Sequence, residues 1–234
     1  MKKLQNITAV ITGASSGIGE GIAKGLALEG ANVVLAARSV DKLAQIKREI
    51  NEQGNENVLT VQTDVSNQQD IDNLVKKAEA AFDHIDVLVN NAGQMLTAPV
   101  LSGKVGEWEQ MIDVNIKGLL YGIHSVLPAM LNRSSGHIIN VASVSSFEVT
   151  KNSTVYSATK SAVQAISTGL EKELARTGVR ITNISPGMVD TRASGDIPNS
   201  DRKKLETSDI ANAVIYAITQ PPYVNVNEIT IRPV

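Results

Sequence analysis

The sequence contains no cysteine among its 234 residues. This absence excludes a disulfide framework, a thiolate metal site and a cysteine nucleophile, and it is consistent with a reducing compartment. Histidine is also scarce: His84, His124 and His137 are scattered along the chain. Their positions offer no metal-ligand spacing. We therefore predict no metal site.

The sequence also lacks a large charge excess and a long apolar run. Its formal net charge is -2, which argues against a broad nucleic-acid-binding or membrane-binding surface but leaves a local basic patch open. No stretch approaches the roughly 18 apolar residues of a membrane span. The basic start at Lys2 and Lys3 is interrupted by Gln5 and Asn6, so no signal peptide is predicted. We expect a cytoplasmic protein with no nucleic-acid or membrane partner.

Short apolar runs alternate with amphipathic helical patterns along the whole chain. Buried strands are predicted at Ile7–Ile11, Asn32–Ala37, Asn57–Gln62, Ile85–Val89, Gly136–Val141, Val179–Ile184 and Glu228–Ile231. Helices are predicted at Ile18–Leu28, Asp41–Gln53, Gln68–Phe82, Lys104–Met130, Tyr156–Arg176 and Thr207–Ile218. The alternation predicts an α/β fold: one doubly wound parallel sheet of about seven strands with helices on both faces. We expect residues 1–234 to form a single domain, with a mobile lid at about 188–206.

A glycine-rich turn separates the first predicted strand from the first predicted helix. It reads Gly13-Ala14-Ser15-Ser16-Gly17-Ile18-Gly19. Glycines let a backbone approach a pyrophosphate, and a helix N-terminus offers free N–H groups and the positive end of a dipole. The spacing, Gly-x-x-x-Gly-x-Gly, differs from the common G-x-G-x-x-G pattern. The turn nevertheless predicts a nucleotide-binding cradle.

The end of the second predicted strand bears on which dinucleotide binds. An acid at this point takes the ribose 2′-hydroxyl of NAD, whereas an arginine suits the 2′-phosphate of NADP. Here the strand ends in Arg38 and Ser39, and no acid occurs before Asp41. We therefore predict NADP(H), with NAD(H) as the alternative if Arg38 is only a surface residue.

Two further strand ends carry candidate cofactor contacts. Asp64-Val65 follows the third predicted strand, where the carboxylate either accepts from an adenine amine or shapes the turn before a helix capped at Ser66 or Asn67. Asn90-Asn91-Ala92-Gly93 ends the fourth. Gly93 permits close backbone approach, and the two Asn side chains can bond to strand ends or to a cofactor.

Tyr156 and Lys160 are four residues apart on a predicted helix, so their side chains leave the same face. A neighbouring ammonium would favour the phenolate and lower the pKa of the tyrosine, which would make it a usable general acid or base. Such a pair also arises by coincidence on many helices. Its interpretation as chemistry depends on the dinucleotide cradle elsewhere in the chain.

Taken together, these residues resemble the short-chain dehydrogenase/reductase family over nearly the whole chain. The motifs, in family order, are Thr12-Gly13-x-x-x-Gly17-x-Gly19, Asp64, Asn90-Asn91-Ala92-Gly93, Asn115, Ser143, Tyr156-x-x-x-Lys160 and Pro186-Gly187. The resemblance implies a Rossmann fold and NADP(H)-dependent hydride transfer between nicotinamide and a small carbonyl or alcohol substrate. Arg38 resembles the NADP-preferring members.

The resemblance also implies individual roles. Tyr156 would be the general acid or base, and Lys160 would depress its pKa and hold the nicotinamide ribose. Ser143 would bond to the substrate oxygen, and Asn115 would hold a water in a proton relay. The residues after Pro186-Gly187, with Val189 and Thr191, would hold the nicotinamide carboxamide.

Several alternatives stay open. The end of the chain, 227–233, resembles relatives that oxidise 3-hydroxy acids such as serine, and lid residues could meet a carboxylate or form a solvated face; these are Arg192, Arg202, Lys203 and Lys204. A catalytically silent NADP(H)-binding regulator and a methyltransferase are the competing classes. A homodimer or homotetramer is implied through the helices that hold Asn115 and Tyr156. Apolar positions there could serve this interface or the core; they are Leu119, Leu120, Ile123, Val163, Ile166 and Leu170.

Overall fold

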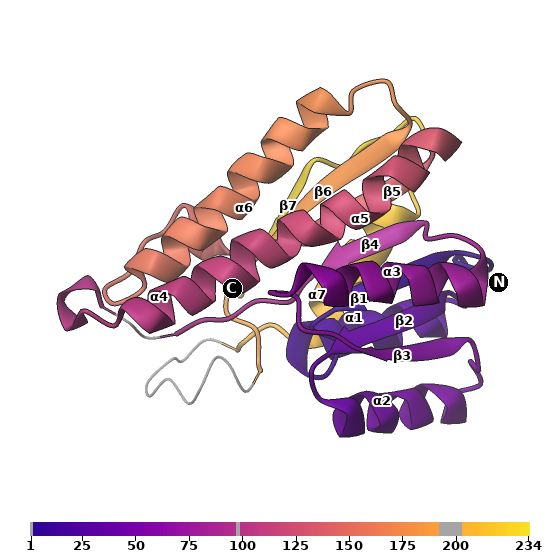
Figure 1. The fold of residues 1–234 in the computed structure, drawn as a ribbon, viewed down its shortest axis with the longest axis horizontal. Coiled ribbons are helices and arrows are strands. Elements are labelled where there is room, and N and C mark those ends of the chain that lie inside the picture. The colour runs from indigo at the N-terminus through magenta and orange to yellow at the C-terminus, as the bar shows by residue number, and fades with distance from the viewer. Residues whose placement is uncertain (1, 97–98, 192–202) are drawn as a thin grey trace.

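The computed structural model describes residues 2–96, 99–191 and 203–234 (Figure 1). Their framework is a seven-stranded sheet in the order β3-β2-β1-β4-β5-β6-β7, in which every neighbouring pair is parallel. The strands are β1 (Thr8–Thr12), β2 (Asn32–Ala37), β3 (Val58–Gln62), β4 (Val87–Asn90), β5 (Gly136–Val141), β6 (Val179–Pro186) and β7 (Glu228–Ile231). The predicted doubly wound parallel sheet is confirmed.

Helices connect the strands and cover both faces of the sheet. They are α1 (Gly17–Leu28), α2 (Val40–Glu52), α3 (Gln68–Phe82), α4 (Val105–Ile112), α5 (Gly118–Arg133), α6 (Thr154–Glu173) and α7 (Thr207–Ile218). Short 3-10 turns lie at Val100–Ser102 and Val144–Ser146. Within the described ranges, no helix is long and apolar enough to cross a membrane.

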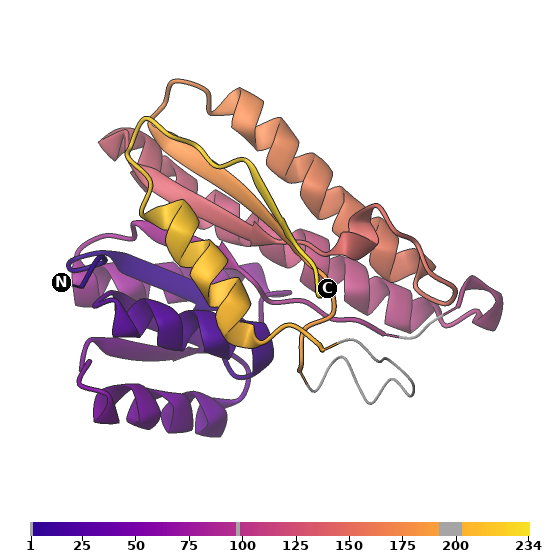
Figure 2. The same ribbon diagram turned by 180° about the vertical axis from the view of Figure 1, so that it is seen from behind.

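The central strands bury both faces, which explains their continuous apolar runs, whereas every residue of the edge strand β7 is exposed or half-buried. All five residues of β1 are buried, and alternate side chains enter two different core clusters: Ile11 lies in one and Val10 in the other. Helices α1, α2 and α7 pack on the first face, and α3, α5 and α6 on the second (Figures 1 and 2). The result is a three-layer arrangement in which the carboxyl ends of all strands meet at one edge.

Predicted and observed boundaries differ most between β4 and β5. The pattern predicts one helical stretch over Lys104–Met130, but a π-helical turn, Asp113–Lys117, separates α4 from α5. Gly118 follows the turn, and a Cβ there would stand 2.9 Å from Cγ2 of Val65. The start of α5 therefore lies close to the loop after β3. The extra residue of the π turn, just before this contact, changes which side chains of α5 face the sheet.

Strand β6 also runs two residues beyond its predicted end. Ser185 and Pro186 pair with Thr230 and Ile231 of β7. The neighbouring strand β7 extends past the predicted end of β6 at Ile184 and so offers these two residues a partner. A proline at the end of a strand is compatible with this pairing, since the lost donor matters less there than in a strand interior.

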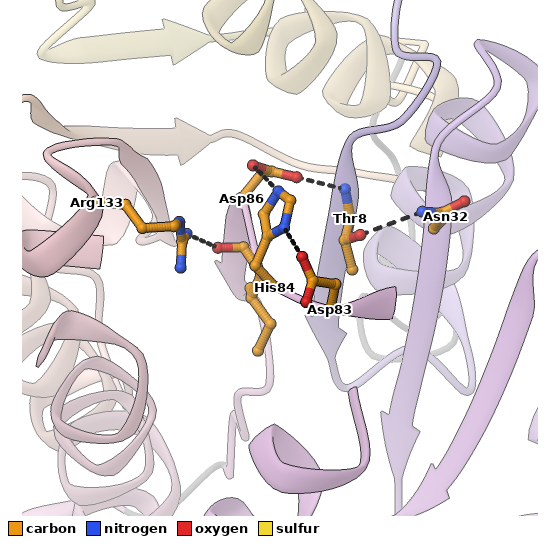
Figure 3. A network of polar contacts seen from close by, with 7 residues as sticks. Thr8, Asn32, Asp83, His84, Asp86 and Arg133 are labelled. Carbon is orange, nitrogen blue, oxygen red and sulfur yellow. Dashed lines mark hydrogen bonds and ion pairs between the residues drawn. The ribbon is translucent and has the colours of Figure 1, made fainter. Parts of the chain in front are cut away.

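A polar network joins β1 and β4 at their amino ends, far from the carboxyl edge (Figure 3). Asp86 accepts from the backbone N–H of Thr8 at 2.8 Å, and its other oxygen lies 3.1 Å from Nε2 of His84. Arg133 donates to the carbonyl oxygen of Ile85 at 2.7 Å. These contacts connect α5 and two central strands, so this end of the sheet has a structural role.

Candidate active site

The candidate site lies at the carboxyl ends of β1, β4, β5 and β6. The chain runs from β1 outward through β2 to β3, then returns to β4 on the other side of β1. Parallel sheets bind ligands at such a reversal of strand order, because the loops on either side diverge and leave a crevice. The glycine turn, Asn90-Asn91-Ala92-Gly93, Ser143 and Pro186-Gly187 lie at these strand ends, whereas Asn115 and the Tyr156–Lys160 pair lie on helical segments.

The glycine turn after β1 packs closely against the loop after β4. Gly13 and Gly17 have φ values of +66° and +58°, a region that favours glycine. A Cβ on Gly13 would stand 2.8 Å from Cα of Ala92, and one on Gly19 would stand 2.4 Å from Nδ2 of Asn91. Ser15 and Ser16 precede α1, whose first-turn N–H groups have no acceptor within the helix. The turn can therefore bring free donors close to an anionic group.

Thr12 and Asn91 hold this turn in place. The Thr12 hydroxyl donates to Val89 O at 3.2 Å and accepts from the N–H groups of Asn91 and Ala92 at 3.1 and 3.0 Å. The Asn91 side chain donates to Thr12 O at 2.8 Å. Of the two roles left open for Asn91, the structure shows bonding to strand ends. The role of Thr12 was missed, since a threonine before Gly13 gives no signal until its partners on β4 are known.

Arg38, Ser39 and Asp64 lie at the ends of β2 and β3. Arg38 is exposed, and Ser39 starts α2 without a side-chain capping bond. Asp64 accepts from the N–H and hydroxyl of Ser66 at 3.0 and 2.7 Å. Burial opposes ionisation of Asp64, but these bonds and the charge of Arg38 outweigh it, so the pKa of Asp64 falls below its ordinary value. Asp64 thus shapes the turn, and Asn67 caps α3 as predicted.

Ser143 and Tyr156 meet between β5 and α6. Ser143 follows β5 in an extended conformation, and its Oγ accepts from the N–H of Ser145 at 3.1 Å. The side chain of Ser143 favours ionisation of the Tyr156 hydroxyl, but burial is the larger effect and raises the pKa of Tyr156 above its ordinary value. The prediction of a lowered Tyr156 pKa is therefore wrong for this structure, because loss of solvation outweighs any help from neighbouring charge.

Lys160 is buried one helical turn beyond Tyr156. It is 5% exposed, and its Nζ donates to Val141 O at 2.7 Å. Burial lowers the pKa of Lys160 from 10.5 to about 8. The same Nζ is 3.3 Å from where a Cβ on Gly93 would stand. Gly93 thus leaves the lysine close to the backbone of the β4 loop.

Asn115 connects the β4 loop to α6. It lies in the π turn, 2% exposed; its Oδ1 accepts from Gln94 N at 2.7 Å, and its Nδ2 donates to Gln94 O at 3.0 Å. Nδ2 also donates to the hydroxyl of Thr159 at 2.9 Å, which itself donates to Tyr156 O at 2.7 Å. Gln94 and Thr159 were missed, although each adjoins a motif residue. The relay water at Asn115 stays a prediction.

The segment after β6 lies at the same end of the sheet. Gly187 N donates to Ile231 O at 2.7 Å, and Val189 pairs with Leu205 in an isolated bridge. The side chain of Thr191 approaches Gly17: its Cγ2 is 3.2 Å from a Cβ placed there. Thr191 and the glycine turn are thus neighbours.

The proposed lid is only partly described. Arg192 and Arg202 lie outside the described residues. Lys203 forms an exposed ion pair with Glu206 at 3.0 Å, and Lys204 lies 3.8 Å from Asp190. These pairs are compatible with the solvated-face alternative for the lid lysines.

Comparison with known proteins agrees with this geometry. The family model for "short chain dehydrogenase" matches residues 7–202. An uncharacterized oxidoreductase of Staphylococcus aureus (strain MW2) is 55% identical over 234 residues, all of both chains. A closed form of serine dehydrogenase complexed with NADP+ is 34% identical with a TM-score of 0.89, covering 96% of this chain and 94% of that one. A metagenomic short-chain oxidoreductase in complex with NADP is 33% identical with a TM-score of 0.87, covering 99% of each chain. The chain therefore belongs to the short chain dehydrogenase family of oxidoreductases.

Proposed function

We propose that the protein is an NADP(H)-dependent oxidoreductase that interconverts a small carbonyl compound and the corresponding alcohol. The observation that carries this proposal is the position of Ser143 beside Tyr156, with Lys160 buried one turn away and the glycine turn at the same sheet edge. Two similar solved structures contain NADP+ or NADP, which supports the choice of cofactor. Family membership disfavours the methyltransferase alternative.

The residues at the crevice fit a nicotinamide dinucleotide. The close approaches at Gly13 and Gly19 leave no room for side chains, and the start of α1 would hold the pyrophosphate. Arg38 and Ser39 would bind the 2′-phosphate, because an exposed guanidinium and a free hydroxyl match its charge and oxygens. Asp64 and Val65 would border the adenine.

The remaining cofactor contacts would come from the loops after β4 and β6. Ala92 and Gly93 would border the ribose beside Lys160. Asn91 would hold this loop in position, because its side chain donates to Thr12 O at the end of β1. Pro186-Gly187, Val189 and Thr191 would hold the nicotinamide carboxamide.

The catalytic steps of this chain are proton transfers. When bound, the nicotinamide supplies or accepts the hydride. In reduction, Ser143 binds the substrate oxygen and Tyr156 gives it a proton; the raised pKa of Tyr156 keeps that proton in place at neutral pH. Lys160, with a pKa of about 8, is mostly charged at pH 7 and offsets the negative charge left on the phenolate.

The test is Tyr156→Phe, assayed for NADPH binding and for turnover on a panel of carbonyls and alcohols. We expect kcat to fall at least about 100-fold with cofactor binding retained, because the phenyl ring keeps the shape and loses the proton. Tyr216→Phe is the matched control, since Tyr216 is exposed on α7. Wild-type turnover in Tyr156→Phe would refute the role. Cofactor binding without turnover in either protein would favour a catalytically silent regulator.

A narrower substrate class, 3-hydroxy acids, is the second candidate. It is supported by the 34% identity to a serine dehydrogenase over nearly the whole chain. L-serine and other 3-hydroxy acids should therefore be screened with NADP+ beside neutral alcohols of the same length. Higher kcat/KM for the acids would support this class, and a preference for the neutral alcohols would exclude it.

We also propose a homodimer or homotetramer that pairs the α4–α5 and α6 surfaces. Leu119, Ile123 and Val163 are buried in the core of one chain, so only the outward positions can serve an interface. Leu120 is 43% exposed on α5, while Ile166 and Leu170 of α6 are half-buried. Light scattering should give a multiple of 24.9 kDa, and Leu120→Asp should reduce it; a wild-type monomer at micromolar concentration would refute the proposal.

A further inference from the structure

A cavity of about 90 Å³ lies on the α6 side of the sheet, between α6 and the β6–β7 edge. Its walls include Gln164, Thr168 and Glu171, which lie three or four residues apart and so share one face of α6. Asn183 of β6 and Glu228 of β7, paired in register, form the opposite wall. None of the residues assigned to the oxidoreductase site lines this cavity. An inference about what binds in it therefore does not depend on the proposed function.

Asn183 is the most informative of these residues. It is 3% exposed, and its Nδ2 donates to the Ser185 hydroxyl at 3.1 Å. Its carbonyl Oδ1 is buried and has no hydrogen-bond partner among the residues that the structure describes. A buried acceptor without a donor costs roughly 1–3 kcal/mol. An acceptor left in this state beside a cavity marks a place where a ligand with donors would bind.

Two carboxylates border the same space. Glu171 accepts from Nδ2 of Asn227 at 2.6 Å, and Glu228 accepts from Nε2 of Gln164 at 3.3 Å. Neither forms an ion pair with any lysine, arginine or histidine in the described ranges. The cavity therefore combines an unpaired buried acceptor with two negative charges that lack a positive partner.

The remaining wall and the volume distinguish between kinds of cation. Ile181, 2% exposed, contributes an apolar surface. A bare Ca2+ or Mg2+ ion needs about six or more oxygens converging at roughly 2.0–2.6 Å, whereas only two carboxylates border this space of about 90 Å³, and no cluster of three metal-ligating side chains occurs among the described residues. A primary ammonium has three N–H donors on an alkyl stem. Its donors match Asn183, Glu171 and Glu228, and its stem matches Ile181.

We propose that this cavity binds a primary alkylammonium group, held by Asn183 Oδ1 and the carboxylates of Glu171 and Glu228. The group comes either from a free small amine or from a lysine side chain of a second copy of the chain. This assigns a role to Asn227 and Glu228, which stand in the C-terminal segment 227–233 and do not belong to the catalytic site.

The experiment is a ligand-observed NMR titration of n-butylammonium chloride against the full-length protein at constant ionic strength. Glu171→Gln and Glu228→Gln keep the side-chain shape and remove one charge each; Glu173→Gln, also exposed on α6 but not lining the cavity, is the matched control. We expect saturable binding, weakened about tenfold by each cavity variant and unchanged by the control. Tetramethylammonium, which carries the charge without N–H donors, should not compete.

Each of the following results would overturn the proposal: no saturable binding, equal competition by tetramethylammonium, or wild-type affinity in both cavity variants. Displacement of n-butylammonium by a lower concentration of Ca2+ would also overturn it, since the site would then be a metal site. Light scattering during the titration separates the two sources. A constant mass indicates a free amine, and dissociation to a smaller species indicates a lysine from a second copy; both agree with an ammonium site.

Discussion

Lys160→Met should make the protein more stable at pH 7 while abolishing turnover. Lys160 is fully buried, and burial lowers its pKa from 10.5 to about 8. One pKa unit corresponds to about 1.4 kcal/mol, so keeping this lysine charged below pH 8 costs the fold about 3 kcal/mol. Methionine has a similar length and carries no charge. It loses the 2.7 Å bond to Val141 O, which costs about 1 kcal/mol. The expected net gain is about 2 kcal/mol.

The stability difference between wild type and Lys160→Met should depend on pH in a defined direction. The unfolded chain holds the lysine proton up to pH 10.5 and the folded chain only to about 8, so between these values the unfolded state binds more protons. The free energy of unfolding of the wild type must therefore rise with pH across this window. The advantage of Lys160→Met is complete below pH 8 and disappears as pH approaches 10.5.

Urea unfolding of wild type and Lys160→Met at pH 7, 8, 9 and 10 measures this difference. Lys172→Met is the matched control, because Lys172 is exposed near the end of the same helix. The control should differ from wild type by less than about 1 kcal/mol at every pH. A Lys160→Met variant that is less stable than wild type at pH 7, or a difference that does not change with pH, would refute the reasoning.

Three other predictions follow from contacts at the sheet edges. Gly19→Ala should destabilise the protein by about 1–3 kcal/mol and weaken NADPH binding, because its Cβ would meet Asn91 at 2.4 Å; Gly106→Ala, with open space in α4, should not destabilise it. Asp86→Ala should cost about 1–2 kcal/mol in thermal unfolding by leaving Thr8 N without its acceptor, whereas Asp83→Asn should be near neutral, because Asp83 is almost fully exposed and asparagine tolerates its positive φ. Arg38→Ala should weaken NADPH binding about tenfold or more in a fluorescence titration and leave NADH binding unchanged, with the exposed Arg48→Ala as control; equal binding of both cofactors to wild type would show that Arg38 is only a surface residue.

The strand pattern could be predicted because parallel strands bury both faces. Runs such as Asn32–Ala37 and Gly136–Val141 match the observed strands at both ends. The π turn at Asp113–Lys117 could not be predicted in this way. Its apolar residues keep a helical spacing, and the extra residue is stabilised by contacts with the loops after β3 and β4, which the local pattern does not contain.

Some residues of the candidate site could likewise be predicted from the sequence, and others could not. Glycines at 13, 17 and 19 could be predicted from their spacing, because the positive φ of Gly13 and Gly17 and the close approach of Asn91 to Gly19 favour glycine at these positions. Gln94 and Thr159 were missed because neither residue type is distinctive, and each matters only through its bond to Asn115. The direction of the Tyr156 pKa was wrong because spacing on a helix shows which groups are neighbours but not how deeply they are buried.

By itself, the sequence determined the alternation of strands and helices, the position of the glycine turn and the residue types available for proton transfer, since each depends on local spacing and side-chain chemistry. The tertiary structure decided the strand order, the placement of Ser143 beside Tyr156, and the loss of solvation at Lys160. It also decided that Asn183, Glu171 and Glu228 border one cavity. These features depend on contacts between segments far apart in the chain, and such contacts exist only after the sheet has formed.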